Sequence, residues 1–363
     1  MKVRQDNPFH PQFGRRPDLF IGRDDIIRDF IAGLDNLNDP YRTTVVTGIR
    51  GSGKTALLAG IKERIDPKRY AVVDVTVGNE LNQSIIDQLQ LAVNAPQRRV
   101  TGASVGALGF GIGMETSLKE CQHGFRYYLS LLVEELAKHK KGVVFLVDEV
   151  HNAVPDTREF VTSYQHLVRD KADVALLMAG LPQAVNSVLN DRILTFMHRA
   201  NKIVLDCISL MLVRHLYKKT FTEVGFTYTE GSLELAADAT FGFPYLIQLI
   251  GYYIWNSGCA KIDEQVVEEA VLNSKADLYK NVYQLMLRES SARDQDYLFA
   301  MLEDENATSI RVLSVRVGAS AGTSSRYRER LIEGGFVVAS ARGYLKLAPP
   351  YFKEFLALQY FSL

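Results

Sequence analysis

Residues 43–65 read TTVVTGIRGSGKTALLAGIKERI, and this stretch decides the fold that we expect. Within it, residues 48–55 (GIRGSGKT) fit the pattern G-x-x-x-x-G-K-[ST]. An apolar strand precedes the pattern and a helix follows it. Glycines let successive backbone N–H groups turn toward phosphate oxygens, and the helix N-terminus adds its positive dipole end. The sequence therefore predicts a loop that binds nucleotide phosphates.

Two side chains of this loop have expected roles of their own. Lys54 is expected to reach the β- and γ-phosphates, and the hydroxyl of Thr55 is expected to ligate Mg²⁺. The alternative, a chance glycine-rich turn, is disfavoured because strand, loop and helix follow one another in the required order. The residues assigned to nucleotide binding are Gly48, Ile49, Arg50, Gly51, Ser52, Gly53, Lys54, Thr55 and Ala56.

A second buried strand supplies the carboxylates that such a site needs. Five apolar residues (143–147) are followed by Asp148 and Glu149. We expect Asp148 to hold Mg²⁺ through its water shell and Glu149 to act as the general base on the attacking water. The alternative is a pair of surface carboxylates at a strand end, and the phosphate-binding loop upstream favours the catalytic interpretation. His151, just beyond, is assigned no role.

Composition excludes several classes of protein. Lys plus Arg number 42 and Asp plus Glu number 42, so a uniformly basic coat for nucleic acid is excluded, although a local basic patch is not. The three cysteines, Cys121, Cys207 and Cys259, lie far apart, which argues against a disulfide scaffold or zinc site. Apolar runs fall short of the ~18 residues that span a bilayer. We therefore expect a soluble, cytoplasmic protein without a membrane partner.

Short β-branched runs alternate with helical segments in the first part of the chain, which predicts an α/β fold with a parallel sheet covered on both faces. The predicted strands are residues 43–47, 70–75, 142–147, 173–179 and 202–206. This core is expected to span residues 1–207, and its first 20 residues are expected to form an extended arm. The glycine-rich segment 101–113 fits a mobile loop or a hairpin, and both interpretations stay open.

Beyond about residue 208 the sequence predicts helices without strands, as an all-α subdomain over residues 208–290. Its helices are expected at residues 209–224, 232–240, 244–257 and 263–289. A third unit covers residues 291–363. Helices at 293–303, 309–317 and 323–333, followed by a two-stranded wing within 336–348, predict a winged helix-turn-helix.

Together these motifs resemble the AAA+ branch of P-loop ATPases. More narrowly, the chain is similar to the group that links origin-recognition and cell-division-cycle initiator ATPases with STAND-type switch ATPases. It is most similar to the bacterial "ATP-binding protein" type with a C-terminal winged helix. Beyond the loop, the stretches that carry the resemblance are NPFHPQFGRRPDLFIGRDDII (7–27), ALLMAGLPQ (175–183), FMHRANKIVLDCISL (196–210) and ATFGFPYLIQLIGYYIW (239–255).

The resemblance implies further site residues. Gly22 and Arg23 would line the adenine pocket, and Pro244 would abut the base from the helical subdomain, which becomes a lid. Arg199 would be an arginine finger that stabilises the γ-phosphate in trans; the alternative is a solvated arginine at a helix end. The sequence departs from the family pattern at two places. Pro244-Tyr245 stands where a sensor arginine is usual, and Gln183 is the nearest polar residue to the sensor-1 position. Both departures favour slow turnover.

The C-terminal unit carries a local excess of positive charge. Between Ser309 and Ala348 there are seven basic residues against two acidic ones. Arginines on the third helix would meet duplex DNA in the major groove, and one at the tip of the wing would meet its backbone. The alternative is a winged helix for protein contacts with a solvated basic face. The candidate DNA-binding residues are Arg326, Arg328, Arg330 and Arg342.

We therefore expect an ATPase that uses ATP or ADP with Mg²⁺ and couples its nucleotide state to DNA binding, with slow or partner-stimulated hydrolysis. The alternative is a STAND-like switch or scaffold that acts through protein partners and self-association. A third hypothesis is a loader that acts on a partner protein. Adenine is preferred to guanine on the resemblance, since a guanine-reading N-K-x-D motif is missing from the sequence after the predicted core strands.

Overall fold

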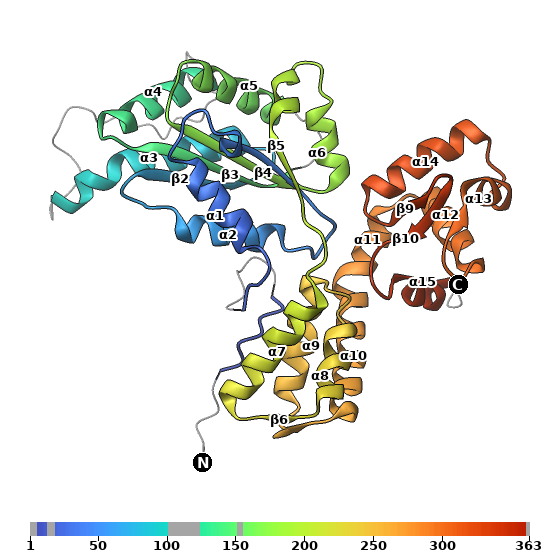
Figure 1. The fold of residues 1–363 in the computed structure, drawn as a ribbon. Coiled ribbons are helices and arrows are strands. Elements are labelled where there is room, and N and C mark those ends of the chain that lie inside the picture. The colour runs from blue at the N-terminus through green and yellow to red at the C-terminus, as the bar shows by residue number, and fades with distance from the viewer. Residues whose placement is uncertain (1–5, 13–18, 101–123, 151–154, 361–363) are drawn as a thin grey trace.

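The computed structural model describes residues 6–12, 19–100, 124–150 and 155–360 (Figure 1). The glycine-rich segment 101–113 and His151 lie outside the described residues. The chain forms an α/β core, a helical lid below it in the view of Figure 1, and a C-terminal unit beside both.

The core is built on a five-stranded parallel sheet in the order β2-β3-β4-β1-β5, which confirms the predicted fold class. All five predicted strands are present. They are β1 (Thr43–Thr47), β2 (Tyr70–Thr76), β3 (Gly142–Val150), β4 (Val174–Gly180) and β5 (Asn201–Val204).

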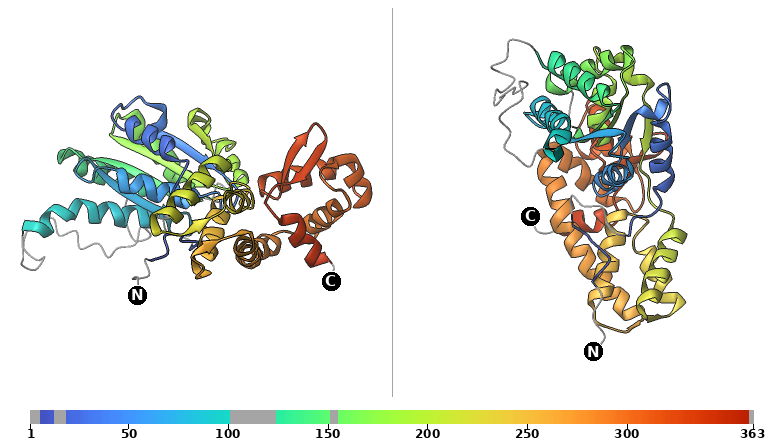
Figure 2. Two further views of the ribbon diagram at one scale, coloured as in Figure 1. Left: turned by 60° about the horizontal axis from the view of Figure 1, so that its bottom comes forward. Right: turned by 90° about the vertical axis from the view of Figure 1, so that its left-hand side faces the viewer.

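Helices cover both faces of this sheet (Figure 2). Alternate residues of a strand point to opposite faces, and β3 is apolar on both: Val143 and Phe145 join one buried cluster, and Val144 and Leu146 join the other. The helices of the core are α1 (Asp24–Gly33), α2 (Lys54–Arg64), α3 (Leu81–Val100), α4 (Phe125–Lys138), α5 (Pro155–Arg169) and α6 (Pro182–Leu189), with short 3₁₀ turns η1 (Pro40–Arg42) and η3 (Thr195–Arg199).

The lid is mostly helical, as predicted, with two differences. The two-residue strands β6 (Thr227–Tyr228) and β7 (Lys261–Ile262) pair, so the prediction that strands stop near residue 208 is wrong; two residues are too short for a period to be detected. The helix predicted over 263–289 contains a π-helical turn, η4 (Tyr279–Tyr283). The lid helices are α7 (Leu210–Val224), α8 (Glu230–Asp238), α9 (Pro244–Asn256), α10 (Glu264–Leu278) and α11 (Gln284–Glu289).

The N-terminal arm, which the sequence assigned to the core, packs on the lid. Phe9 is fully buried there, and its ring lies 5.7 Å from that of Tyr217 and 6.5 Å from that of Trp255. Gly251 on α9 makes room for Phe9, because a Cβ at that position would overlap the ring. Gln248 binds two segments of the arm. Its Oε1 accepts a hydrogen bond from the His10 N–H at 3.0 Å, and its Nε2 donates one to the carbonyl oxygen of Leu19 at 3.0 Å.

The C-terminal unit contains the predicted helices and the predicted two-stranded wing. A short strand, β8, and a final helix, α15, were not predicted; β8 completes an antiparallel sheet in the order β8-β10-β9. The elements are α12 (Ala292–Ala300), η5 (Met301–Glu303), β8 (Thr308–Ser309), α13 (Ile310–Arg316), α14 (Ala321–Glu333), β9 (Val337–Ala341), β10 (Tyr344–Leu347) and α15 (Phe352–Tyr360).

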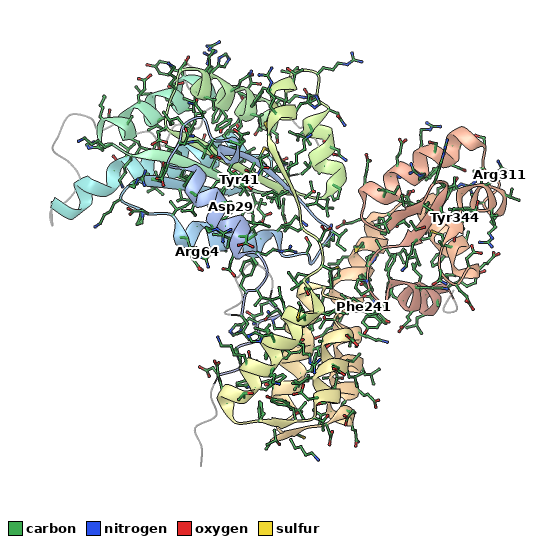
Figure 3. All side chains as sticks on the ribbon, in the orientation of Figure 1. Asp29, Tyr41, Arg64, Phe241, Arg311 and Tyr344 are labelled. Carbon is green, nitrogen blue, oxygen red and sulfur yellow. The ribbon has the colours of Figure 1, made fainter. Side chains whose placement is uncertain are left out.

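The lid and the C-terminal unit share one hydrophobic core. A single cluster of buried residues runs from Phe243 and Leu246 of the lid to Leu331 and Phe355 of the C-terminal unit. At its edge, Phe241 lies at the joint between the two (Figure 3), with its ring 5.2 Å from that of Tyr351. These contacts attach the C-terminal unit firmly to the lid.

Candidate nucleotide-binding site

The loop between β1 and α2 has the backbone of a phosphate-binding loop. Gly51 and Gly53 have φ of +80° and +90°, in the left-handed region that favours glycine. A Cβ at Gly51 would lie only 2.6 Å from the ring of Phe243 on the lid. Gly53 directly precedes α2, so the loop ends at the N-terminus of that helix, where backbone N–H groups are free to bind anions.

Lys54 is held inside this loop. Its Nζ donates hydrogen bonds to the carbonyl oxygens of Gly48 at 2.8 Å and Ile49 at 3.0 Å. The pKa of Lys54 is lowered to about 8, mainly by burial; the carboxylate of Asp148 opposes this shift, and the charge of Arg50 adds to it. The protein thus weakens the hold of this amine on its proton, and nearby phosphate anions would strengthen it.

The two candidate metal ligands lie in contact. The hydroxyl of Thr55 donates a hydrogen bond of 2.6 Å to Oδ2 of Asp148, which is 8% exposed. Hard oxygen donors of this kind are those that Mg²⁺ takes in proteins, together with phosphate oxygens and water. Among the described residues there is no group of three or more His, Cys, Asp or Glu that could hold a metal ion. A Mg²⁺ ion beside Thr55 and Asp148 would also take phosphate oxygens and water as ligands.

Glu149 has an unusual backbone conformation. Its φ is +51°, and its N–H donates to Oδ1 of Asp148 at 2.8 Å. A non-glycine residue in this region costs ~1–3 kcal/mol, and such strain is concentrated at functional sites. The twist sets the exposed Glu149 side chain apart from the buried Asp148 side chain, so the two carboxylates face different surroundings.

A cavity of about 820 Å³ joins these groups to the arm and the lid. It brings together Arg23, Asp148, Glu149, Pro244 and the loop residues 50–56. Of the other predicted residues, Gly48, Ile49 and Gly22 lie outside its lining among the described residues; a Cβ at Gly22 would lie 2.9 Å from Ile208.

Part of the cavity lining is apolar, beside polar side chains such as His10, Gln12 and Gln248. Leu19, Phe20 and Ile21 come from the arm, and Ile208 and Pro244 from the lid. Arg23, 8% exposed, donates to the carbonyl of Asp206. Burial lowers the pKa of this guanidinium, and the neighbouring carboxylate of Asp206 opposes that shift.

Several residues of the site were missed from the sequence, and one group of them comes from the lid. Tyr245 follows Pro244, and Asn281, Val282 and Leu285 form a stripe on the helix that runs through η4. Asn281 hydrogen-bonds to the hydroxyl of Tyr245, whose pKa is nonetheless raised because it is buried. At this place the lid therefore presents uncharged polar groups to the cavity. The π-helical turn, which contains Asn281 and Val282, has no signature in the sequence.

A further lid residue, Glu289, contacts the phosphate loop directly. Its carboxylate forms an ion pair with the guanidinium of Arg50, and both side chains line the cavity. Next to Arg50, Ile49 points away from the cavity and packs against the shared core of the lid and the C-terminal unit. Gly335, which follows α14, makes room for it: a Cβ there would lie 2.8 Å from Cγ2 of Ile49.

Arg199 lies outside this cavity. It ends η3 on the surface of the core, beside the edge strand β5. It is not among the described residues that line the nucleotide cavity, so within one chain the structure does not bring it to the phosphates.

The four candidate DNA-binding arginines differ in their surroundings. Arg330 is engaged within its unit: it donates to Asp294 at 2.8 Å and to Ser291 at 2.7 Å, and it lies over the ring of Tyr327. Arg330 is therefore already paired within its unit, although its side chain stays 43% exposed. Arg326 lines a second cavity, of about 330 Å³, with Thr323, Tyr327 and Arg330. In the remaining pair, Arg328 is half-buried on α14 and Arg342 is exposed in the turn between β9 and β10.

Comparisons with known proteins agree with this geometry. Residues 38–189 match the family model of an AAA domain, and residues 280–356 match a domain of unknown function (DUF8462). The Walker-type ATPase PABY2304 of Pyrococcus abyssi has a similar structure, with 18% identity, a TM-score of 0.66, and coverage of 95% of this chain and 97% of that one. The Aeropyrum pernix ORC2 protein, solved as ADPNP-ADP complexes, matches with 14% identity, a TM-score of 0.61 and 96% coverage of both chains. No curated protein matches the sequence.

The phosphate-binding loop thus lies in the part of the chain, residues 38–189, that matches an AAA domain. The arrangement of core, lid and C-terminal unit is similar to that of the two solved ATPases, which confirms the expected resemblance at the level of the fold. In the described part of the chain, none of the helices combines the length and apolar character needed to cross a bilayer.

Proposed function

We propose that this protein binds ATP and ADP with Mg²⁺, hydrolyses ATP slowly, and uses its nucleotide state to control a DNA-binding C-terminal winged helix. The observation that carries the proposal is the cavity that holds Lys54, Asp148 and Glu149 together with the lid residues Pro244 and Tyr245. A nucleotide there would touch core and lid at once. We take residues 1–207 as the core, 208–290 as the lid and 291–363 as the winged helix, with the arm packed on the lid.

The chemistry follows from the residues of the cavity. Lys54 and the N–H groups of the loop would hold the β- and γ-phosphates, and Thr55 and Asp148 would hold Mg²⁺, which would neutralise phosphate charge. Glu149 would accept a proton from the attacking water. The adenine would lie against Ile208 and Pro244.

Slow turnover is supported by what the lid contributes. Tyr245 and Asn281 carry no positive charge, so the lid would do little to stabilise charge on the transferring phosphate. A turnover rate above ~1 per second for the isolated protein would contradict this part of the proposal, since that rate approaches ordinary enzyme turnover.

DNA binding is assigned to Arg326, Arg328 and Arg342. Phosphate contacts release counterions, so log K should fall with log salt by ~0.9 per contact. Replacing Arg326 and Arg342 by alanine together should lower duplex affinity and reduce the salt slope by about two. Lys219→Ala, on the exposed surface of α7, is the matched control. Duplex binding that is equal in the double variant and the wild type would remove the assignment.

A second function, the STAND-like switch with a protein partner, is supported by a different observation. Helix α14 lies against α6 of the core, and Ile49 of the phosphate loop packs beside Gly335. The winged helix is therefore itself bound to the ATPase. The first experiment is ATP hydrolysis with and without duplex DNA at two salt concentrations. Stimulation that fades with salt supports DNA binding, whereas tight nucleotide binding without stimulation supports the switch.

The remaining assignments belong to the same proposal. The protein would act in the cytoplasm, and a homo-oligomer would bring Arg199 of one subunit to the γ-phosphate of the next. A loader acting on a partner protein stays the third hypothesis.

A further inference from the structure

The ion pair between Arg50 and Glu289 joins the phosphate loop to the last residue of α11. Both side chains line the nucleotide cavity, and both remain partly open to solvent, at 36% and 60% exposure. Neither is fixed by burial, so either can take another partner without opening the protein core.

Arg50 lies within electrostatic reach of the expected phosphate position. Its charge is one of the causes that lower the pKa of Lys54, the residue that we expect at the β- and γ-phosphates. A guanidinium binds phosphate oxygens through two parallel N–H donors, with a geometry at least as favourable as for a carboxylate. A terminal phosphate in the cavity would therefore attract Arg50 and repel Glu289.

The pair also marks the joint to the C-terminal unit. Glu289 lies three residues before the start of α12 at Ala292, and Ile49, next to Arg50 in the loop, packs against the core shared by lid and C-terminal unit. Two adjacent loop residues thus hold this joint, one through charge and one through apolar contact.

We propose that Arg50 distinguishes ATP from ADP by leaving Glu289 for the γ-phosphate, and that this exchange releases the joint between the loop and the C-terminal unit. ADP has no γ-phosphate and leaves the Arg50–Glu289 pair in place. The inference rests on the proposed nucleotide binding, and it adds a residue pair that reads the nucleotide state and passes it to the C-terminal unit.

The test is a set of four proteins: the wild type, Glu289→Gln, Arg50→Gln and the double variant. Affinities for a non-hydrolysable ATP analogue and for ADP are measured by calorimetry. Glu289→Gln should bind the ATP analogue at least threefold more tightly, with a smaller change for ADP, because Arg50 loses its competing partner. Arg50→Gln should lower the preference for the ATP analogue at least threefold. In the Arg50→Gln background, Glu289→Gln should have little further effect on this preference.

The matched control is Glu268→Gln, which removes an exposed carboxylate from the preceding helix α10. Glu268 is not among the described residues that line the cavity. A second measurement is hydrogen–deuterium exchange over residues 284–300. The ATP analogue should speed exchange there in the wild type, ADP should not, and Glu289→Gln should speed it without nucleotide.

Two results would overturn the inference. One is an equal change in affinity for the ATP analogue and ADP in Glu289→Gln. The other is an increase in affinity for the ATP analogue on Glu289→Gln that is as large in the Arg50→Gln background as in the wild type. If the wild type binds neither nucleotide, the proposed function fails as well, whereas binding without this coupling removes the inference alone.

Discussion

The hydroxyl of Thr55 and the carboxylate of Asp148, 93 residues apart in the chain, are joined by a hydrogen bond of 2.6 Å. One comes from the start of α2 and the other from the end of β3, so the sheet itself sets their separation. The hydroxyl of Thr55 would hold Mg²⁺ directly, and the carboxylate of Asp148 would hold it through the ion's water shell.

Asp148→Asn should therefore weaken binding of Mg²⁺-ATP by ~10–100-fold, the usual effect of losing a carboxylate that positions the shell around a metal. With Mg²⁺ removed by a chelator, the variant and the wild type should bind nucleotide alike. Glu149→Gln is the paired control: it should bind Mg²⁺-ATP normally but lose hydrolysis. Equal losses in the two variants would contradict the separate roles of these carboxylates.

The pKa of Lys54, about 8 in the free protein, predicts proton uptake on nucleotide binding. Below pH 8 the amine is charged before and after binding, so affinity should be flat. Above pH 8 the free amine loses its proton, and phosphates must restore it; affinity should then fall by up to tenfold per pH unit. Calorimetry at pH 9 in two buffers of different ionisation enthalpy should show uptake of about 0.9 of a proton. Binding without proton uptake at pH 9 would show that Lys54 is charged in the free protein.

Gly251→Ala should displace Phe9 and destabilise the lid. Overpacking typically costs ~1–3 kcal/mol, and Phe9→Ala should cost ~3–5 kcal/mol through the lost burial. In the Phe9→Ala background, the same Gly251→Ala change should become neutral or stabilising by up to ~1 kcal/mol, because alanine favours a helix over glycine and its steric partner is gone. Urea unfolding of the four proteins measures the cycle. Additive costs would mean that Phe9 does not occupy this site in solution.

Arg199 is predicted to act in trans. Subunits with Arg199→Ala and subunits with Lys54→Ala should each hydrolyse ATP poorly, and mixing them should restore part of the turnover, because one intact site can form at their interface. Arg192→Ala, an exposed arginine in the same region of the core, serves as the control and should keep wild-type turnover. A mixture no more active than its two components would leave Arg199 a surface residue.

The sequence predicted the parts of the site that are local. The phosphate loop and the Asp148–Glu149 pair follow from short motifs next to buried strands, because strand, turn and helix are set by neighbouring residues. Phe9 and Gly251 could not be paired in this way, since nothing in the arm indicates a partner more than 240 residues away. Glu289 was missed for a related reason: its contact with Arg50 depends on how the lid sits on the core.

The C-terminal unit illustrates the opposite error. The spacing of Arg326 and Arg330, four residues apart, placed both on one face of a helix, and charge alone suggested one role for both. The structure gives Arg330 a buried partner, Asp294, from a different helix. Spacing identifies which residues share a face, but it does not show what the face is packed against.

The hydrophobic core shared by lid and C-terminal unit has a consequence for how this protein can vary. A chimaera that joined residues 1–290 to a foreign C-terminal unit would cut through that core and leave Leu246 and Tyr283 without the side chains that cover them. An exchange that carries the lid together with its C-terminal unit keeps those contacts. Homologues should therefore be able to exchange the lid and the C-terminal unit together, as one block that begins near Ile208. A change of target specificity should arise more readily by substitutions on the outer face of the C-terminal unit than by exchange of that unit alone.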